Sequence, residues 1–217
     1  MRLLTDPMES LPRSLHLPVS LRVSTSRQIS AQQLAVIAKQ IQNKTREAEA
    51  LIFARSERDL NARIERNSWS VAECFDHLAQ TTNAFLPAIL KVLADTPVLK
   101  TDRTLRTGAL AQLFIWNLEP PYRIRLKVLP QLMPQNRDLI STWQDFITSQ
   151  ARLLEAINSA TGLAIDKVKI KSPVYARFSY NIYGAFRMLA THQRRHLWQI
   201  EQIFAALDRD RSSKDTA

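Results

Sequence analysis

Apolar side chains recur with a helical period in four segments of the chain, over about residues 30–55, 70–93, 138–160 and 179–207. Within each segment they lie three and four residues apart, the spacing that gathers apolar groups on one face of an α-helix. Between the third and fourth segments, Val168 to Lys171 alternates apolar and basic residues, which is typical of a short strand. The pattern therefore predicts four amphipathic helices and one short strand.

Start signals fix the expected N-terminal ends of three of these helices. The second helix has the clearest signal in the chain, Ser70-Val71-Ala72-Glu73, which matches a capping box. Trp69 precedes it and can pack against Cys74 in the first turn, as apolar residues before a helix often do. Ser30 and Ser179 are the predicted N-caps of the first and fourth helices, because a serine hydroxyl accepts a hydrogen bond from a first-turn amide.

Residues 95–137 form a long connector between the second and third helices. Five prolines in this segment exclude one continuous helix, although Ala109–Leu118 is predicted as a short apolar helix. A helix of about 24 residues is about 36 Å long, and the connector is long enough to run back over that distance. The second and third helices can then be parallel. The sequence thus predicts an all-α fold, a four-helix bundle with a long crossover between helices 2 and 3.

The predicted bundle occupies residues 30–207. Residues 1–29 are rich in Ser, Pro and Arg and have no helical period, so we expect a flexible N-terminal extension, within which Met8 is an alternative start. Residues 208–217 are polar, and we expect this tail to fray from Asp208 onward. The chain is thus interpreted as one domain with two extensions.

The composition agrees with an all-α fold and excludes several classes of protein. Three glycines among 217 residues are too few for the many tight turns of a sandwich, a barrel or a dinucleotide-binding fold. No apolar run approaches the ~18 residues of a membrane span, so we expect no transmembrane segment. Cys74 is the single cysteine, which excludes an intrachain disulfide and a cysteine-rich zinc site and favours a cytoplasmic location.

The net charge of +10 permits binding to nucleic acid or to anionic lipid. The basic residues concentrate in the connector, over residues 99–137, rather than along one helix face, and no nucleic-acid recognition motif is present. We interpret most of this charge as solvated surface. A basic module that binds nucleic acid or a membrane surface through the connector stays the minority alternative.

Three of the four histidines fall at positions that face the interior of the predicted bundle. His192 and His196 lie four residues apart on the fourth helix, so their imidazoles share one face. His77 lies beside the apolar stripe of the second helix. If these helices are neighbours, the three imidazoles can converge on one divalent ion and leave a coordination position for water or substrate. On spacing alone, two helical histidines that pair with their neighbours are the favoured alternative.

Two stretches of the chain resemble the DinB-like (DinB/YfiT) superfamily of metalloenzymes: Trp69-Ser70-Val71-Ala72-Glu73-Cys74-Phe75-Asp76-His77-Leu78 and His192-Gln193-Arg194-Arg195-His196-Leu197-Trp198-Gln199. The resemblance covers about residues 30–207 and implies a four-helix bundle with a crossover. It also implies that His77, His192 and His196 hold a divalent metal ion, often zinc or nickel. Characterised relatives include thiol-dependent S-transferases and a mycothiol-dependent maleylpyruvate isomerase. The resemblance thus implies an S-transferase with a small-molecule substrate and a low-molecular-weight thiol as cofactor. A water molecule activated by the ion would give a hydrolase instead.

Residues beside the predicted ligands carry open alternatives. Gln199 is the candidate catalytic residue, holding a metal-bound water or the substrate, or else a glutamine bonded to the backbone. Arg195 is the candidate cofactor-binding residue, for an acidic group, or else pairs with a helix carboxylate. Cys74 could be a fourth ligand or a nucleophile, although a buried core residue is favoured. Asp76 lies off the apolar stripe, and we expect it to be solvated.

Two further hypotheses of the function are alternatives to a metal-dependent enzyme. One is a non-catalytic metal-binding stress-response bundle, which predicts a closed coordination sphere around the ion. The other is the basic module described above, which predicts salt-dependent binding that is indifferent to His77→Ala. A homodimer is also an alternative, because bundles with an open apolar end often dimerise.

Overall fold

The computed structural model describes residues 28–121, 123–124, 127–135, 137–175 and 177–215, and within them the predicted all-α fold is confirmed. The long helices are α1 (Gln28–Phe53), α3 (Val71–Ala94), α5 (Leu139–Ser159) and α6 (Ile182–Asp215). Shorter helices lie between them, namely α2 (Glu57–Asn61), α4 (Ala109–Leu118) and the 3₁₀ helix η3 (Pro130–Leu132). The strands β1 (Lys169–Lys171) and β2 (Ser179–Asn181) form one antiparallel pair, in which Ile170 faces Tyr180.

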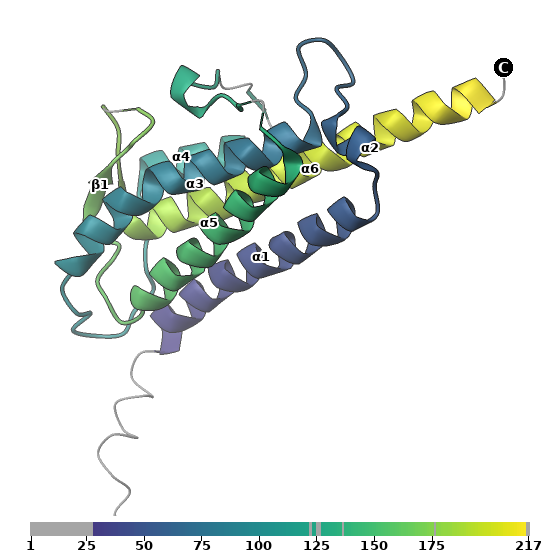
Figure 1. The fold of residues 1–217 in the computed structure, drawn as a ribbon. Coiled ribbons are helices and arrows are strands. Elements are labelled where there is room, and N and C mark those ends of the chain that lie inside the picture. Colours follow the sequence, from purple (N-terminus) through teal and green to yellow (C-terminus); the bar gives the residue numbers. More distant parts are fainter. Residues whose placement is uncertain (1–27, 122, 125–126, 136, 176, 216–217) are drawn as a thin grey trace, which may run out of the picture.

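The long helices pack side by side (Figure 1). α1 and α3 each pack against both α5 and α6, so α1 and α3 lie across the assembly from each other. α3 and α5 run in the same direction, because the segments after their C-terminal ends pair at Val98 and Leu163. The connection between them therefore returns from one end of the helices to the other, carrying α4 and η3 on the way.

Local sequence signals set several helix ends as predicted. Ser70 caps α3 in a capping box, in which the Glu73 amide donates to the Ser70 hydroxyl at 3.2 Å and the Ser70 amide donates to the Glu73 carboxylate at 2.8 Å. α4 has the predicted bounds, Ala109–Leu118. The side chain of Asp138 caps α5 by accepting from the Ser141 amide. α3 and α5 thus begin where the chain carries its own side-chain partner for the first-turn amides, whereas α4 begins after Gly108 without such a cap.

The first helix begins earlier than predicted, and Ser30 is not its N-cap. Ser30 is buried inside the first turn of α1. Asp102, in the connector, accepts hydrogen bonds from the Ile29 amide at 2.7 Å, the Ser30 amide at 3.1 Å and the Ser30 hydroxyl at 2.8 Å. A distant carboxylate thus replaces the local cap. Residues 28 and 29 belong to α1, and the rest of the predicted extension lies outside the described residues.

The fourth helix also differs from its prediction at both ends. Ser179 is not the N-cap, because it pairs with β1 in strand β2, and the Asn181 side chain instead accepts from the Gly184 amide at 2.8 Å. The predicted fraying from Asp208 is wrong, because α6 continues to Asp215. Arg55, just after α1, forms an ion pair with Asp208 at 2.5 Å, and Arg211 pairs with Asp59 of α2. These ion pairs support the exposed last part of α6.

Two hydrophobic clusters form the core. The larger cluster joins α1, α3, α4, α5, α6 and the strand pair, with members that include Leu86, Ile89, Ile157 and Phe186. The smaller cluster joins α1, α2, α3, α5 and α6 near the N-terminal end of α3, with members that include Cys74, Phe75, Phe146 and Phe204. Within the described residues, no helix is both long enough and apolar enough to cross a membrane.

Several cations of the basic connector are engaged within the protein. Arg103 makes two hydrogen bonds to Asp166, at 2.6 and 2.8 Å. The Arg123 guanidinium lies 4.5 Å from the centre of the Trp116 ring, and Arg137 contacts Asp145 at 2.5 Å. The ion pairs of Arg103 and Arg137 compensate part of the positive charge of the connector, whereas Arg123 stays exposed beside Trp116.

Candidate metal centre

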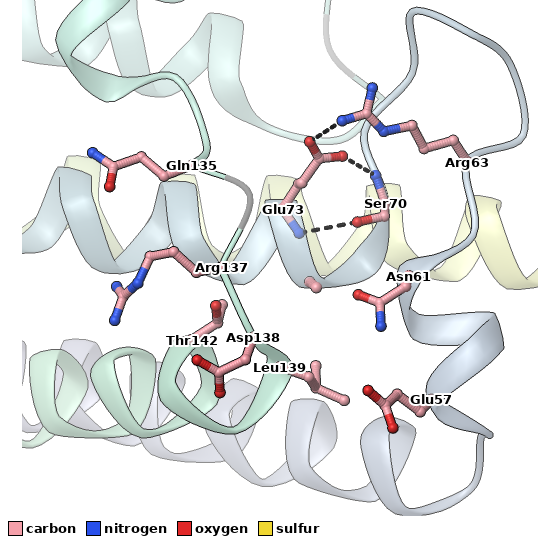
Figure 2. Close-up of a pocket in the computed structure, with 11 residues that line it drawn as sticks. Glu57, Asn61, Arg63, Ser70, Glu73, Gln135, Arg137, Asp138, Leu139 and Thr142 are labelled. Carbon is pink, nitrogen blue, oxygen red and sulfur yellow. Dashed lines mark hydrogen bonds and ion pairs between the residues drawn. The ribbon is translucent and has the colours of Figure 1, made fainter.

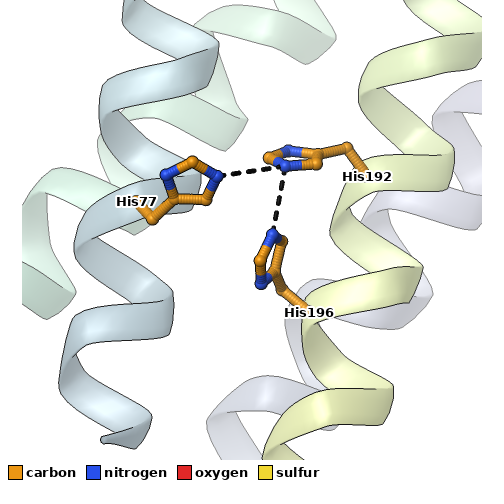
Figure 3. A group of neighbouring side chains, drawn as sticks. All are labelled: His77, His192 and His196. Atoms are coloured by element: carbon orange, nitrogen blue, oxygen red, sulfur yellow. Dashed lines mark hydrogen bonds between the residues drawn. The ribbon is translucent and has the colours of Figure 1, made fainter. Parts of the chain in front are cut away.

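Three imidazoles meet between α3 and α6 (Figure 3). His77 comes from α3, and His192 and His196 come from successive turns of α6. The Nε2 atom of His192 lies 3.2 Å from Nε2 of His77 and 3.1 Å from Nε2 of His196. The ligand atoms that the three residues offer all lie within 4.8 Å of one another. The structure thus brings together the three histidines that the sequence singled out, as a group that could hold a metal ion.

The helices position these side chains through their packing. His196 precedes Leu197 and lies one turn before Ile200, and both of these residues are in the smaller hydrophobic cluster. His77 lies between Cys74 and Leu78, which belong to the same cluster. Each imidazole therefore projects from a helix whose rotation is fixed by buried apolar neighbours. Sites built on packed helices hold their geometry better than sites on loops.

The outer nitrogens of two imidazoles are held by oxygen atoms. Nδ1 of His77 lies 2.8 Å from the carbonyl oxygen of Leu132, in η3, and Nδ1 of His196 lies 3.1 Å from Oε1 of Gln199. Because these oxygens only accept, each Nδ1 carries the proton and donates it. Each Nε2 then presents its lone pair to the centre. This arrangement, in which an outer hydrogen bond fixes the tautomer, is usual for metal-ligating histidines.

The spacing of the three Nε2 atoms fits a bound cation. Ligand nitrogens about 2.0–2.1 Å from a tetrahedral ion are about 3.3 Å apart, close to the observed separations of 3.1 and 3.2 Å. Without a cation, Nε2 of His192 has one proton at most when the imidazole is neutral, and it faces two lone pairs. At least one of the two close nitrogen–nitrogen contacts then has no hydrogen bond, and the facing atoms repel each other. A cation between the three nitrogens removes that repulsion.

The electrostatics of the centre keep the imidazoles neutral. Burial is the main cause that lowers the pKa of His77, although the bond to Leu132 and the charge of Asp76 oppose it. Burial lowers the pKa of His192 and of His196 well below 6.5, and the neighbouring imidazoles and Arg195 lower both further. Neutral imidazole is the form that binds metal. The site is therefore ready to bind a cation at neutral pH.

Trp69 and Leu132 are parts of the site that sequence reasoning missed. The Trp69 ring lies 4.8 Å from the His77 ring and is stacked on the His196 ring at 5.8 Å, centre to centre. We expected Trp69 only to pack near Cys74, and it does pack against the smaller cluster. Its place in the same motif as His77 was the available signal. Leu132 acts through its backbone carbonyl, for which a sequence holds no signal.

The other candidate residues have defined surroundings. Gln199 binds His196 rather than the backbone, and its predicted role toward water or substrate stays a prediction. Arg195 lies close enough for its charge to lower the pKa of the three imidazoles, and its cofactor role stays a prediction. Arg194 pairs with Glu119. Cys74 is fully buried in the smaller cluster, where burial raises the pKa of its thiol, so the core interpretation is favoured.

The prediction that Asp76 is solvated is wrong. Its exposed fraction is 1%, because the connector covers this side of α3. The Gln135 amide donates to Oδ2 of Asp76 at 2.6 Å, and Nε2 of Gln80 donates to the same oxygen at 2.8 Å. A helical stripe shows which face is apolar, but it does not show where a distant loop lies.

Two cavities are lined by residues of α3 together with residues of the connector. One of about 220 Å³ lies between α2 and the N-terminal ends of α3 and α5 (Figure 2). The other, of about 410 Å³, is lined by Asp76, Gln80, Leu132 and Asp145, among others. Gln135 and Arg137 line both cavities. The linings, as far as the described residues define them, contain no histidine, and Leu132 stands between the second cavity and His77.

The fold and the centre define an all-α protein whose long helices carry a three-histidine group that could hold a metal ion. Residues 40–200 match the sequence model of the DinB superfamily. Because the match spans more than half of the chain, the protein belongs to the DinB superfamily, whose members are associated with metal binding. No curated protein and no solved structure gives a significant match to the chain.

Proposed function

We propose that the protein is a divalent-metal-dependent enzyme that acts on a small molecule, with His77, His192 and His196 as the ligands of the ion. One observation carries the proposal, namely that Nε2 of His192 lies 3.2 Å from Nε2 of His77 and 3.1 Å from Nε2 of His196, which is close to the spacing of ligands around one ion. We further assign the assembly of α1, α3, α5 and α6 to the four-helix-bundle class with a crossover, which places such sites between facing helices.

Zinc and nickel are the ions we favour, because imidazole suits both. A divalent ion held by His77, His192 and His196 would supply Lewis acidity to a bound small molecule. The residues around it have separate tasks. The Leu132 carbonyl and Gln199 hold the imidazoles in the ligating tautomer, and Trp69 packs against two of them, which limits the approach of water.

The charge of the centre favours an anionic reactant. The convergent group contains three neutral imidazoles and, within the described part of the chain, no carboxylate. The charge of Arg195 adds to that of a divalent ion, because it already acts on all three imidazoles. A thiolate or a carboxylate would compensate this charge. This positive charge supports an S-transferase that uses a low-molecular-weight thiol, and a hydrolase is the other reaction class that we consider. We place the reaction in a reducing cytoplasm.

Metal analysis of tag-free protein after dialysis tests the proposal. We expect about one equivalent of transition metal in the wild type, and its loss in His77→Ala, His192→Ala and His196→Ala. His16→Ala is the matched control, because it removes the remaining histidine of the chain, and it should keep the metal. If no metal binds after loading with zinc or nickel, the proposal fails.

Cobalt substitution then separates an enzyme from a metal-stabilised bundle. An open coordination position predicts that an added small thiol changes the visible spectrum of the cobalt protein. A spectrum that is indifferent to thiol and to azide would indicate a closed sphere and a structural ion. Assays for thiol transfer and hydrolysis follow only in the first case. Gel filtration at several concentrations tests the predicted homodimer separately.

A further inference from the structure

Asp76 is a buried carboxylate beside a candidate ligand, although it faces another side of the helix. Successive residues of an α-helix point about 100° apart, so Asp76 faces the connector while His77 faces α6. Only 1% of Asp76 is exposed. Its Oδ1 atom has no hydrogen bond within the described structure, and the nearest cation, Arg137, is 3.7 Å away and bound to Asp145. A buried carboxylate is costly, so its presence calls for a function.

The contacts of Asp76 fasten the connector to α3. Its Oδ2 atom accepts a hydrogen bond from the backbone amide of Gln135 at 2.6 Å. Gln80, one turn later on α3, donates both to Asp76 at 2.8 Å and to the Met133 carbonyl at 3.3 Å. Asp76 and Gln80 therefore hold residues 133–135 at two points. This short segment follows η3 directly, with one backbone hydrogen bond closing the turn from Met133 to Pro130.

The fastened segment carries the atom that orients His77. The Leu132 carbonyl, which accepts from Nδ1 of His77 at 2.8 Å, immediately precedes residues 133–135. η3 is a single turn of three residues, so it has little rigidity of its own. The position of this carbonyl thus depends on what holds the residues that follow it. In the described structure, Asp76 provides the shortest of those contacts.

We propose that Asp76 is a positioning residue for the centre. It fixes residues 133–135 on α3, the Leu132 carbonyl stays over Nδ1 of His77, and Nε2 of His77 keeps its lone pair toward His192. The part of the proposal that concerns metal affinity rests on the proposed function. The part that concerns the His77 tautomer holds for the metal-free protein as well.

Nitrogen-15 NMR of the histidine rings in metal-free protein tests the tautomer. We expect His77 to be protonated at Nδ1 in the wild type and to become a mixture of tautomers in Asp76→Ala. Asp76→Asn should restore the wild-type signal, because its amide oxygen still accepts from the Gln135 amide. Asp145→Asn is the matched control, since Asp145 lines the same cavity and binds Arg137. It should leave the His77 signal unchanged.

Hydrogen exchange and metal affinity give two independent measurements on the same variants. The Gln135 amide should exchange at least about 10-fold faster in Asp76→Ala and at the wild-type rate in Asp145→Asn. Zinc affinity in Asp76→Ala should fall about 10-fold, the lower end of the range for partners of metal ligands, because Asp76 acts through a segment. If Asp76→Ala does not fold, Gln80→Ala removes the second fastening point and should shift the same three measurements in the same direction.

The outcomes separate the two proposals. A wild type that binds no zinc defeats the metal proposal, while the tautomer and exchange measurements still decide the role of Asp76. A wild-type His77 tautomer together with wild-type zinc affinity in Asp76→Ala defeats the positioning role. The positioning role is also contradicted if Asp76→Ala and Asp76→Asn change the His77 tautomer and the zinc affinity equally, since only Asp76→Ala removes the hydrogen-bond acceptor.

Discussion

The larger hydrophobic cluster and the histidine centre use the same helices but bury different chemistry. In the cluster, Leu86, Ile157 and Phe186 are at most 1% exposed and leave only apolar surface out of water. In the centre, His77 and His196 are each 5% exposed, and burial keeps their rings neutral. Burial of apolar groups stabilises a fold, whereas burial of titratable groups costs stability. Burial thus stabilises the fold in the cluster and costs stability in the centre, as expected of a group of side chains with the proposed metal-binding function.

The largest expected effect comes from removing a ligand of the centre. His196→Ala should weaken zinc binding by more than about 100-fold. Mutation of a residue that only hydrogen-bonds a metal ligand already lowers metal affinity by about 10–100-fold, and His196 is itself a proposed ligand. The free energy of unfolding of the metal-free protein should not fall, since a desolvated imidazole is removed. Competition with a coloured chelator measures the affinity, and urea denaturation measures the stability. Wild-type zinc affinity in this variant would contradict the assignment.

The cluster should show the opposite behaviour. Ile157→Ala should lower the free energy of unfolding by about 2–5 kcal/mol, because it leaves a cavity in a fully buried site. The variant should still bind zinc with the stoichiometry of the wild type. Ile140→Ala, on the same helix but with 71% of Ile140 exposed, is the control and should change stability by less than about 0.5 kcal/mol. Similar losses in the two variants would contradict the assigned core.

Acid should lower the free energy of unfolding through the buried imidazoles of the centre, whereas the apolar side chains of the cluster do not titrate. The pKa of His196 is well below 6.5 in the folded protein because of burial, so below about pH 6.5 the unfolded chain binds a proton that the folded chain does not. The free energy of unfolding of the metal-free protein therefore falls as pH drops, by up to about 1.4 kcal/mol per pH unit for each such imidazole. Denaturation at pH 7 and pH 5 measures the difference. This fall in the free energy of unfolding between pH 7 and pH 5 should be smaller in His196→Ala than in the wild type and unchanged in Ile157→Ala. An equal fall in the wild type and both variants would contradict the assignment of the pH dependence to the buried imidazole.

A smaller effect on zinc binding than the loss of a ligand should come from Gln199, which touches the centre through one hydrogen bond. Gln199→Leu should weaken zinc binding by about 10–100-fold, because His196 loses the acceptor that fixes its tautomer. Glu201→Gln, an exposed position on the same helix, is the control and should bind zinc as the wild type does. If Gln199→Leu binds zinc normally but loses turnover, Gln199 acts on water or substrate instead.

Sequence reasoning succeeded where the signal and the structure are both local. The capping box at Ser70 and the bounds of α4 depend on neighbours within one or two turns. The histidine pair on α6 follows from helical spacing in the same way. His77 required one further assumption, that the second and fourth helices are neighbours. The helical stripes left that assumption open, and the resemblance to the DinB-like superfamily supplied it.

It failed where distant segments compete with local ones. Ser179 is a good N-cap by itself, but its strand pairing with β1 moves the start of α6 to the next suitable residue, Asn181. Ser30 loses its capping position to Asp102, 72 residues away. Asp76 is buried by a connector whose path no periodicity describes. Each failure is a tertiary contact that overrides a local preference.

The place of α6 in the chain sets the order in which the centre can form during synthesis. When the ribosome has made His77, 115 further positions separate it from His192, which is about 6–23 s of translation at ordinary rates. α3 and α5 are therefore made, and can begin to pack, before a complete set of ligands exists. Under the proposed function, uptake of the ion therefore has to wait for the synthesis of α6, because a nascent chain that stops before α6 contains only one of the three proposed ligands, His77.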